Sequence, residues 1–290
     1  MTTQSNSDQS LEGKIVMVTG ANAGMGKEIS LALAGKGASL VMVCRDRARG
    51  EAARADVQEK TGNRTVELMV ADLSLQSSIR NLVKEFEARH DRLNVLVNNA
   101  GITMSRRETT LEGVEVVFAT NHLGPFLLTN LLLPVLTAGA PSRVVTVSSA
   151  AHAMGRMDFA DPQGVVSYNE IRVYNQSKLA NVLFTYELAR RIAGTGVSAN
   201  VVEPGFVKTN MKVPFPFSLF SFMRRPAADG AKPTVFVASS PEVAGVTGSF
   251  FNVKGVMTRS SQGSYDVDSA TKLWELSAKL TNLDSPEAAC

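Results

Sequence analysis

The sequence predicts one doubly wound α/β domain, in which parallel strands alternate with helices. Six short runs of apolar and β-branched residues recur along the 290-residue chain. A longer segment with the apolar spacing of an amphipathic helix separates each run from the next. No repeat and no Pro/Gly/Ser-rich linker divides the chain, so we expect a single domain.

The expected strands are continuous apolar runs, which is typical of strands covered on both faces. They lie at residues 14–19, 40–44, 66–70, 93–97, 143–147 and 197–202, with residues 250–253 as a possible seventh strand. The expected helices lie at residues 26–36, 48–60, 77–89, 111–137 and 174–193. This order predicts a central, mostly parallel sheet of seven strands joined by right-handed crossovers.

The domain itself is expected to span residues 13–282, between a polar disordered tail at 1–12 and a short tail at 283–290. Residues 1–10 lack the apolar core of a signal peptide and the arginine-rich pattern of a transit peptide, so we expect a cytoplasmic chain. The most apolar stretch, residues 123–135, contains two prolines and a glycine. We therefore expect no integral membrane span.

Composition excludes several classes of protein. The chain has 30 Lys+Arg against 27 Asp+Glu, a formal net charge of +3, and no basic stripe, so a nucleic-acid partner is not expected. Two cysteines, Cys44 and Cys290, are too few for a disulfide framework, and with three histidines they show no metal-ligand spacing. The content of 44% hydrophobic and 20% charged residues is that of an ordinary globular protein.

A glycine-rich loop follows the first expected strand and precedes a helix. Its spacing is GxxxGxG, and the residues that we assign to it are Gly20, Asn22, Gly24, Met25 and Gly26. Glycines allow a tight turn that brings backbone N–H groups and a helix N-terminus against a pyrophosphate. The alternative is a simple strand-to-helix turn, but the position within a βαβ series favours a dinucleotide site.

The end of the second strand bears on the choice of dinucleotide. An acidic residue there would accept from a ribose 2′-hydroxyl, whereas a cation would meet a 2′-phosphate. Cys44 occupies the expected tip and Arg45 follows it, which favours NADP(H) over NAD(H). Asp46 is the counter-argument, and both charged residues could instead begin a solvated helix. Lys27 and Arg49 are candidate helpers in phosphate binding.

Tyr174 and Lys178 stand four residues apart in a helical stretch, so they share one helix face. A free phenol has a pKa near 10, and a nearby cation lowers that pKa toward the working range of an acid–base catalyst. The alternative is an ordinary helix face, because this four-residue spacing is common by chance.

Several motifs in order resemble the short-chain dehydrogenase/reductase family. They are the glycine loop at residues 19–26, the NNAG segment at 98–101, Asn121, Ser148 and the Tyr174/Lys178 pair. The resemblance covers about residues 13–248, nearly the whole chain. It implies a single Rossmann-type domain and hydride exchange between a nicotinamide cofactor and an alcohol or carbonyl compound.

The resemblance implies that four residues take part in proton transfer to and from the substrate oxygen. Tyr174 is the general acid in reduction and the base in the reverse direction. Lys178 holds the nicotinamide ribose and lowers the pKa of Tyr174. Ser148, at the end of the fifth strand, hydrogen-bonds the carbonyl oxygen. Asn121 helps to hold a water in a proton relay.

The resemblance also assigns cofactor contacts at the ends of later strands. Asp72 and Leu73 would lie at the adenine; Asn98, Ala100 and Gly101 beside the cofactor; Tyr174 and Lys178 at the ribose; and Pro204, Gly205, Val207 and Thr209 over the nicotinamide.

The separation of Ser148 from Tyr174 is about twice the family's usual gap. The inserted segment makes Ser149 and Tyr168 alternative candidates, but Tyr168 has arginine rather than lysine four residues later. His152, in the same insert, is expected at the surface, with an approach to the substrate as the alternative. The insert resembles the branch of retinol dehydrogenases and WW-domain oxidoreductases. That branch implies NADP(H) and a lipophilic alcohol, aldehyde or ketone.

An aromatic, proline-containing segment at residues 213–223 follows the sixth strand. We interpret residues 205–228 as a lid over an apolar substrate. A loop packed on the core and a membrane-contacting patch are the alternatives. The rival for the whole protein is a non-catalytic nucleotide sensor or scaffold, which the complete catalytic set disfavours. The family resemblance further implies a homodimer or homotetramer.

Overall fold

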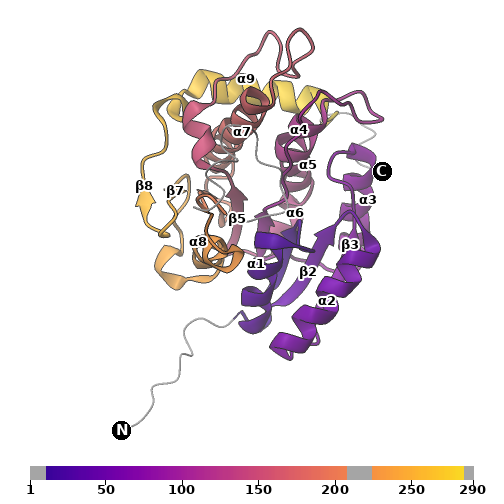
Figure 1. Ribbon diagram of the computed structural model, residues 1–290. Helices are drawn as coiled ribbons and strands as arrows, with labels where there is room; N and C mark the ends of the chain where they lie inside the picture. Colours follow the sequence, from indigo (N-terminus) through magenta and orange to yellow (C-terminus); the bar gives the residue numbers. More distant parts are fainter. Residues whose placement is uncertain (1–10, 208–223, 284–290) are drawn as a thin grey trace.

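The computed structural model describes residues 11–207 and 224–283, and within them one eight-stranded sheet forms the centre of the molecule (Figure 1). The order of its strands is β3-β2-β1-β4-β5-β6-β7-β8, and only the β7–β8 pair is antiparallel. The strands are β1 (Ile15–Thr19), β2 (Ser39–Cys44), β3 (Val66–Val70), β4 (Val95–Asn98), β5 (Ser142–Val147), β6 (Val197–Val202), β7 (Phe250–Phe251) and β8 (Met257–Thr258). The prediction of a single α/β domain with a mostly parallel sheet is confirmed.

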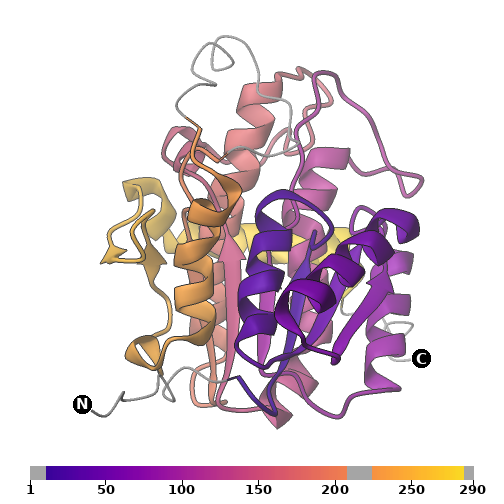
Figure 2. The same cartoon turned by 60° about the horizontal axis from the view of Figure 1, so that its bottom comes forward.

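Helices cover both faces of the sheet. On one face lie α1 (Gly24–Gly35), α2 (Arg47–Thr61) and α8 (Ala227–Ser239), and Figure 2 shows α1 and α8 side by side in front of the strands. On the other face lie α3 (Gln76–Glu87), α5 (Gly124–Leu131), α6 (Leu133–Ala138) and α7 (Glu170–Arg191), with α9 (Val267–Leu280) packed on α7. Each layer buries its own apolar cluster against the strands, which is why the strands read as unbroken apolar runs.

The single helix expected at residues 111–137 is wrong. A bridge between Thr109 and Glu115 makes its first part a turn, and helical structure begins only at α4 (Val116–Phe118). A π-helical turn, η2 (Ala119–Leu123), follows, and then α5 and α6, each with proline in its first turn. Proline fits the first turn of a helix but cannot donate within its interior, so each one starts a new segment.

Other boundaries differ where tertiary contacts decide them. Leu11, which the sequence analysis placed in the tail, is buried, and its N–H donates to the Lys36 carbonyl. Helix α7 begins at Glu170, so Tyr174 lies one turn inside it rather than at its start. Strand β8 and helices α8 and α9 are absent from the sequence analysis. Most of the proposed lid, residues 208–223, lies outside the described residues.

No helix in the described ranges is both long and apolar enough to cross a membrane.

Asn94, just before β4, connects β1 to the segment after α6 at the amino end of the sheet. Its side-chain oxygen Oδ1 accepts from the Ile15 N–H at 2.9 Å, and its side-chain Nδ2 donates to the Gly139 carbonyl at 2.8 Å. The side chain is buried, so both partners depend on it for a hydrogen bond.

We predict that Asn94→Ala lowers the free energy of unfolding by about 2–4 kcal/mol, because two buried backbone groups lose their partner. Urea denaturation measures the change. Asn130→Ala is the matched control, since that amide donates to the Phe126 carbonyl within its own helix, and it should cost less than about 1 kcal/mol. Equal losses in the two variants would contradict the assigned role of Asn94.

Candidate active site

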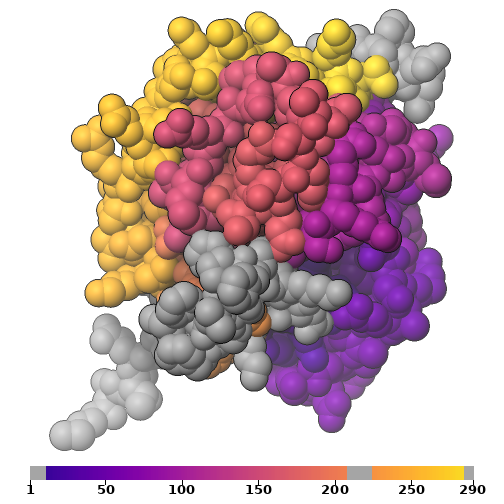
Figure 3. Space-filling view, turned by 45° about the horizontal axis from the view of Figure 1, so that its top comes forward, coloured from indigo at the N-terminus to yellow at the C-terminus, as the bar shows by residue number. Residues whose placement is uncertain are grey.

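The site lies where the parallel strands end and the strand order reverses between β1 and β4. The loops after these two strands diverge to opposite sides of the sheet and leave a crevice at their carboxyl ends. Figure 3 looks onto this end, where the rose-coloured insert after β5 lies between the magenta segment before α4 and the yellow C-terminal segment. Within residues 11–207 and 224–283, the sequence-predicted site residues end or follow strands at this edge, lie in the first turn of α1, or lie on η2 and α7.

The glycine loop is a cradle that side chains would fill. Gly20 and Gly24 have positive φ angles of 66° and 53°. A Cβ on Gly26 would lie 2.2 Å from the Gly20 carbonyl oxygen, so only glycine allows α1 to start this close to β1. The residue that precedes α1 is Ala23, whose side chain makes no capping hydrogen bond. The first N–H groups of α1 therefore suit the pyrophosphate of a dinucleotide.

Thr19 ties the glycine loop to the loop after β4. Its hydroxyl accepts from the N–H groups of Asn99 and Ala100 at 2.9 and 3.1 Å, and the Asn99 amide donates to the Thr19 carbonyl at 2.8 Å. A Cβ on Gly20 would lie 3.0 Å from Ala100 Cα. Thr19 and Asn99 thus shape the cradle, whereas the sequence indicated them only as members of the two family motifs.

Asn98 does not face the cradle with its side chain. It is buried, and its amide donates to the Thr129 hydroxyl of α5 at 2.9 Å. The Asn98 side chain therefore links β4 to α5, so only the backbone of Asn98 could contact a cofactor. Leu73 likewise packs its side chain in the core, so only its backbone can contribute to a site.

Exposed basic side chains follow the tip of β2, and Arg45 is the first of them. The Arg45 side chain is 75% exposed, and its Nη1 lies 3.7 Å from Asp72 Oδ2 at the end of β3. Asp46 caps α2 by accepting from the Arg49 N–H at 2.9 Å, which leaves it engaged as a helix cap. Lys27, a candidate helper, instead pairs with Asp56 at 2.8 Å. Arg45 is thus the exposed cation that directly follows β2, with Arg47 and Arg49 exposed beside it.

Tyr174 and Ser149 meet at the centre of the site. Burial raises the pKa of the Tyr174 phenol, and a hydrogen bond with the Ser149 side chain opposes that shift. Ser149 also accepts from the Ala151 N–H at 3.2 Å, as the cap of the 3-10 helix η3 (Ala150–Met154). Its hydroxyl is thereby held toward the phenol.

The Ser148 side chain points away from Tyr174, which favours Ser149, the alternative that the sequence left open. Its hydroxyl is buried and donates to the Lys178 backbone carbonyl at 2.8 Å. Successive residues of an extended chain point to opposite sides, so only one of the two serines can face Tyr174. The register of β5 gives that place to Ser149, which the sequence alone left as the alternative.

Lys178 is a buried cation. Its side chain is 3% exposed, and Nζ donates to the Val147 carbonyl at 3.3 Å. No carboxylate pairs with it among the residues that the structure describes. Burial alone lowers its pKa to about 8. Nζ lies 5.7 Å from the centroid of the Tyr174 ring and 3.4 Å from the position of a Cβ on Gly101, so a larger residue at 101 would crowd the amine.

Asn121 lies in the π-helical turn beside this group. Its side chain accepts from the Ile102 N–H at 2.8 Å and donates to the Ile102 carbonyl at 3.0 Å, and it also donates to the Ser177 hydroxyl at 3.0 Å. A π turn in a helix frequently marks a functional position. Asn121 therefore fixes the loop after β4 against α7, next to Lys178.

The segment after β6 closes the other side. Gly205 has a φ of 80°, and Val207 pairs with Arg225 across a bridge that leads back into α8. A Cβ on Gly230 would lie 2.4 Å from Val207 Cγ2, so α8 packs tightly on this segment. Thr209 lies outside the described residues.

Tyr168 links the insert to the loop after β4 and does not stand beside Lys178. Its hydroxyl donates to the Met104 carbonyl at 3.0 Å, and burial raises its pKa far above the usual value. Gln163 makes a parallel link, because its side chain accepts from the Glu115 N–H at 3.0 Å. The insert after β5 is thus fastened to the segment before α4, and Tyr174 is left as the phenol beside Lys178.

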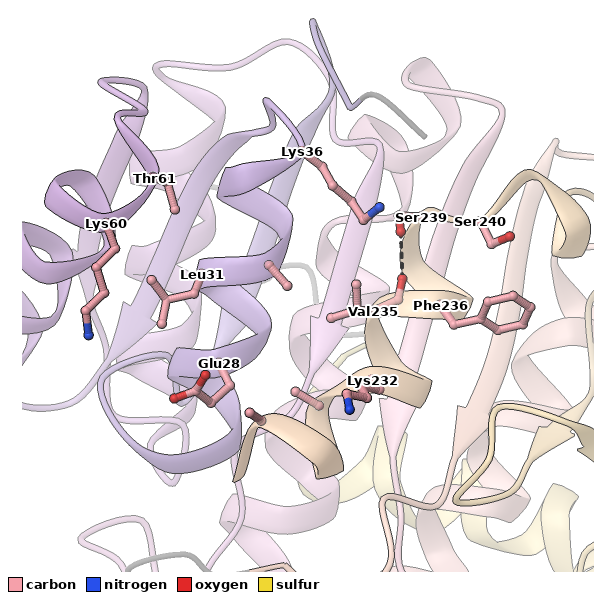
Figure 4. A pocket seen from close by; sticks show the side chains of 13 residues that line it. Glu28, Leu31, Lys36, Lys60, Thr61, Lys232, Val235, Phe236, Ser239 and Ser240 are labelled. Atoms are coloured by element: carbon pink, nitrogen blue, oxygen red, sulfur yellow. Dashed lines mark hydrogen bonds between the residues drawn. The ribbon is translucent and has the colours of Figure 1, made fainter. Parts of the chain in front are cut away.

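A surface groove of about 590 Å³ lies elsewhere, between α1, the end of α2 and α8 (Figure 4). Leu31, Val235 and Phe236 give it apolar walls. No residue that lines it belongs to the catalytic group, and its Lys60 and Lys232 are paired with aspartates.

Comparisons with known proteins agree with this geometry. The short chain dehydrogenase family model matches residues 14–216. Human retinol dehydrogenase 11 is 42% identical over 278 residues, which cover 94% of this chain and 87% of the relative. The bovine dehydrogenase/reductase SDR family member 13 is 40% identical and covers 97% of this chain and 76% of its own length.

Solved structures share the fold. An uncharacterised protein from Mycobacterium paratuberculosis superposes with a TM-score of 0.79 at 35% identity, over 95% of this chain and 96% of its own. The NADP complex of RhlG from Pseudomonas aeruginosa superposes with a TM-score of 0.69 at 25% identity, over 84% of this chain and 95% of its own. The chain belongs to the short-chain dehydrogenase family, in its retinol-dehydrogenase-like branch, and is an oxidoreductase of alcohols and carbonyl compounds.

Proposed function

We propose that the protein uses NADP(H) to interconvert a lipophilic aldehyde or ketone and its alcohol. The observation that carries this proposal is the group of Tyr174, Ser149 and Lys178 beside the glycine cradle. The cradle, the uncapped N-terminus of α1 and the amine of Lys178 fit the pyrophosphate and ribose of a dinucleotide.

A bound nicotinamide cofactor supplies the hydride. The protein's part is to bind the carbonyl oxygen and to move one proton. Tyr174 Oη and Ser149 Oγ both donate to that oxygen, and Tyr174 gives up its proton as the alkoxide forms. In the oxidation of an alcohol, the tyrosinate takes the proton back.

The charge of Lys178 makes this proton transfer feasible near neutral pH. Burial raises the pKa of Tyr174 and lowers that of Lys178 to about 8, so at pH 7 the amine is still mostly protonated. A cation 5.7 Å from the phenol ring favours the tyrosinate over the neutral phenol. Asn121 holds the loop that lies over this amine.

The preference for NADP(H) rests on Arg45, whose side chain is exposed at the tip of β2 beside Asp72. A guanidinium group binds phosphate in a bidentate manner, and no acidic residue occupies the tip itself. The NADP complex of RhlG, which shares the fold, supports the same choice.

A lipophilic substrate is supported by the relatives and by the insert. Several of the curated relatives are named retinol dehydrogenases. The insert also exposes Met154, Phe159, Val165 and Val166 at the end of the molecule where the site opens. Apolar side chains at such a mouth favour a substrate with an apolar body.

We predict that Tyr174→Phe lowers kcat by at least about 1,000-fold, because the variant lacks the proton donor. Oxidation of NADPH is followed by absorbance with decanal and with retinal. The Kd for NADPH, measured by fluorescence, should stay within about threefold of wild type. Tyr168→Phe is the control and should keep kcat within about threefold. Full activity in Tyr174→Phe would overturn the mechanism, and a wild type without any turnover would favour a nucleotide sensor.

The two serines give a second test. Ser149→Ala should lower kcat by about 100-fold, the usual cost of one oxyanion donor. Ser148→Ala should lower kcat less than about fivefold and act mainly on Tm, because its hydroxyl serves the Lys178 carbonyl. Steady-state kinetics and thermal unfolding of both variants measure these effects. The reverse ranking of kcat would restore Ser148 as the catalytic serine.

Removal of the Arg45 cation tests cofactor choice. Arg45→Ala should raise the KM for NADPH about 10- to 100-fold and leave the KM for NADH nearly unchanged, because only NADPH carries the 2′-phosphate. The control is Arg54→Ala, an arginine of the same helix region that pairs with Glu51 and should change neither constant. If Arg45→Ala weakened both cofactors alike, phosphate recognition would have to lie elsewhere.

A further inference from the structure

His152 is buried beside the catalytic serine, although the sequence analysis expected it at the surface. It lies on η3, three residues after Ser149, and its side chain is 4% exposed. Its ring lies 5.0 Å, centroid to centroid, from the ring of Phe250 on β7. The proposed function gives this side chain no role.

The hydrogen bonds of the ring fix its tautomer. Nε2 lies 3.1 Å from the backbone nitrogen of Ser261, and Nδ1 lies 2.7 Å from the Ser149 carbonyl oxygen. A backbone N–H can only donate, so Nε2 must be the acceptor and carry no proton. The proton therefore lies on Nδ1, which donates to the Ser149 carbonyl. Both bonds can form only with the neutral ring.

The far side of this ring is a rigid polar turn. Ser260 Oγ lies 2.7 Å from the Tyr186 hydroxyl on α7 and 2.6 Å from Ser264 Oγ. Ser264 Oγ in turn donates to the Ser261 carbonyl at 2.6 Å. These contacts hold the Ser261 N–H in place against α7, the helix that also carries the catalytic phenol.

These contacts connect two positions on α7. Tyr186 contacts the turn at Ser260, and the Ser261 N–H of that turn donates to His152. His152 donates to the Ser149 carbonyl, and the Ser149 hydroxyl is hydrogen-bonded to Tyr174 on the same helix.

We propose that His152 is a positioning residue: its Nδ1–H holds the Ser149 carbonyl so that the Ser149 hydroxyl faces the substrate oxygen. This inference rests on the proposed function, in which Ser149 contacts that oxygen. The turn at Ser261 selects the tautomer that can donate. The C-terminal segment after β8 thus supports the catalytic group without touching substrate.

The two polar ends of the ring can be separated by substitution. His152→Asn keeps a donor near the place of Nδ1 and loses the acceptor for Ser261. His152→Gln keeps an acceptor near the place of Nε2 and loses the donor to Ser149. Tyr186→Phe breaks the circuit at its far end and is the control for loss of stability alone, since Ser264 still holds Ser261.

We predict that His152→Gln and His152→Ala lower kcat with NADPH and decanal about 10- to 100-fold, with the Kd for NADPH within about threefold of wild type. His152→Asn and Tyr186→Phe should keep kcat within about threefold, although all four variants lose several degrees of Tm. In ¹⁵N-histidine-labelled protein at pH 7, long-range ¹H–¹⁵N spectra should show a protonated Nδ1 and a bare Nε2 for His152.

The inference is overturned if His152→Ala keeps the wild-type kcat, if the loss of kcat simply follows the loss of Tm across the four variants, or if Nε2 carries the proton. Failure of the proposed function has a different signature, because it shows as absence of turnover in the wild type or full turnover in Tyr174→Phe. In that case a crystal structure of His152→Ala decides the inference: the Ser149 hydroxyl should have left Tyr174, and an unmoved hydroxyl would refute it.

Discussion

The seam between β1 and β4 is the constraint on which the rest of the structure depends. The strand order reverses there, so the chain must leave the two strands on opposite faces of the sheet. Buried side chains fasten the seam at both ends: Asn94 joins β1 to the segment after α6, and Thr19 binds the loop after β4. With the seam fixed, the glycine cradle and the NNAG loop face each other across one crevice.

The stability of the surrounding fold holds Lys178 in its buried position beside Tyr174. Lys178 is buried without a carboxylate partner among the described residues, an arrangement that disfavours its charged form. Helix α7 is otherwise buried for most of its length, and its packing holds the amine beside Val147. Burial of the amine lowers the stability of the folded protein. It also places a cation close to the phenol that releases a proton in the proposed function.

Two local irregularities place the remaining groups. The π turn at Ala119–Leu123 lets Asn121 reach back to Ile102, and the short η3 helix caps itself with Ser149 and buries His152. Periodicity in the sequence does not predict either turn, because each is too short to show a repeating pattern. Contacts with α7 and with the C-terminal segment set their shapes. These two turns fix the positions of the polar side chains of Asn121, Ser149 and His152.

The sequence by itself determined the fold class and the family, and it predicted most of the residues that the structure brings together at the candidate site. The sequence shows apolar runs, helical periodicity and the spacing of Tyr174 and Lys178. Each of these patterns involves residues close together in the chain, so it can be recognised without the fold. Only the tertiary structure decided between Ser148 and Ser149, because the choice depends on which face of the chain meets α7 at the end of β5. The tertiary structure also showed that the side chains of Asn98 and His152 are buried and hydrogen-bonded to Thr129 and Ser261. The sequence around each residue does not indicate these bonds, because the partners are far apart in the chain.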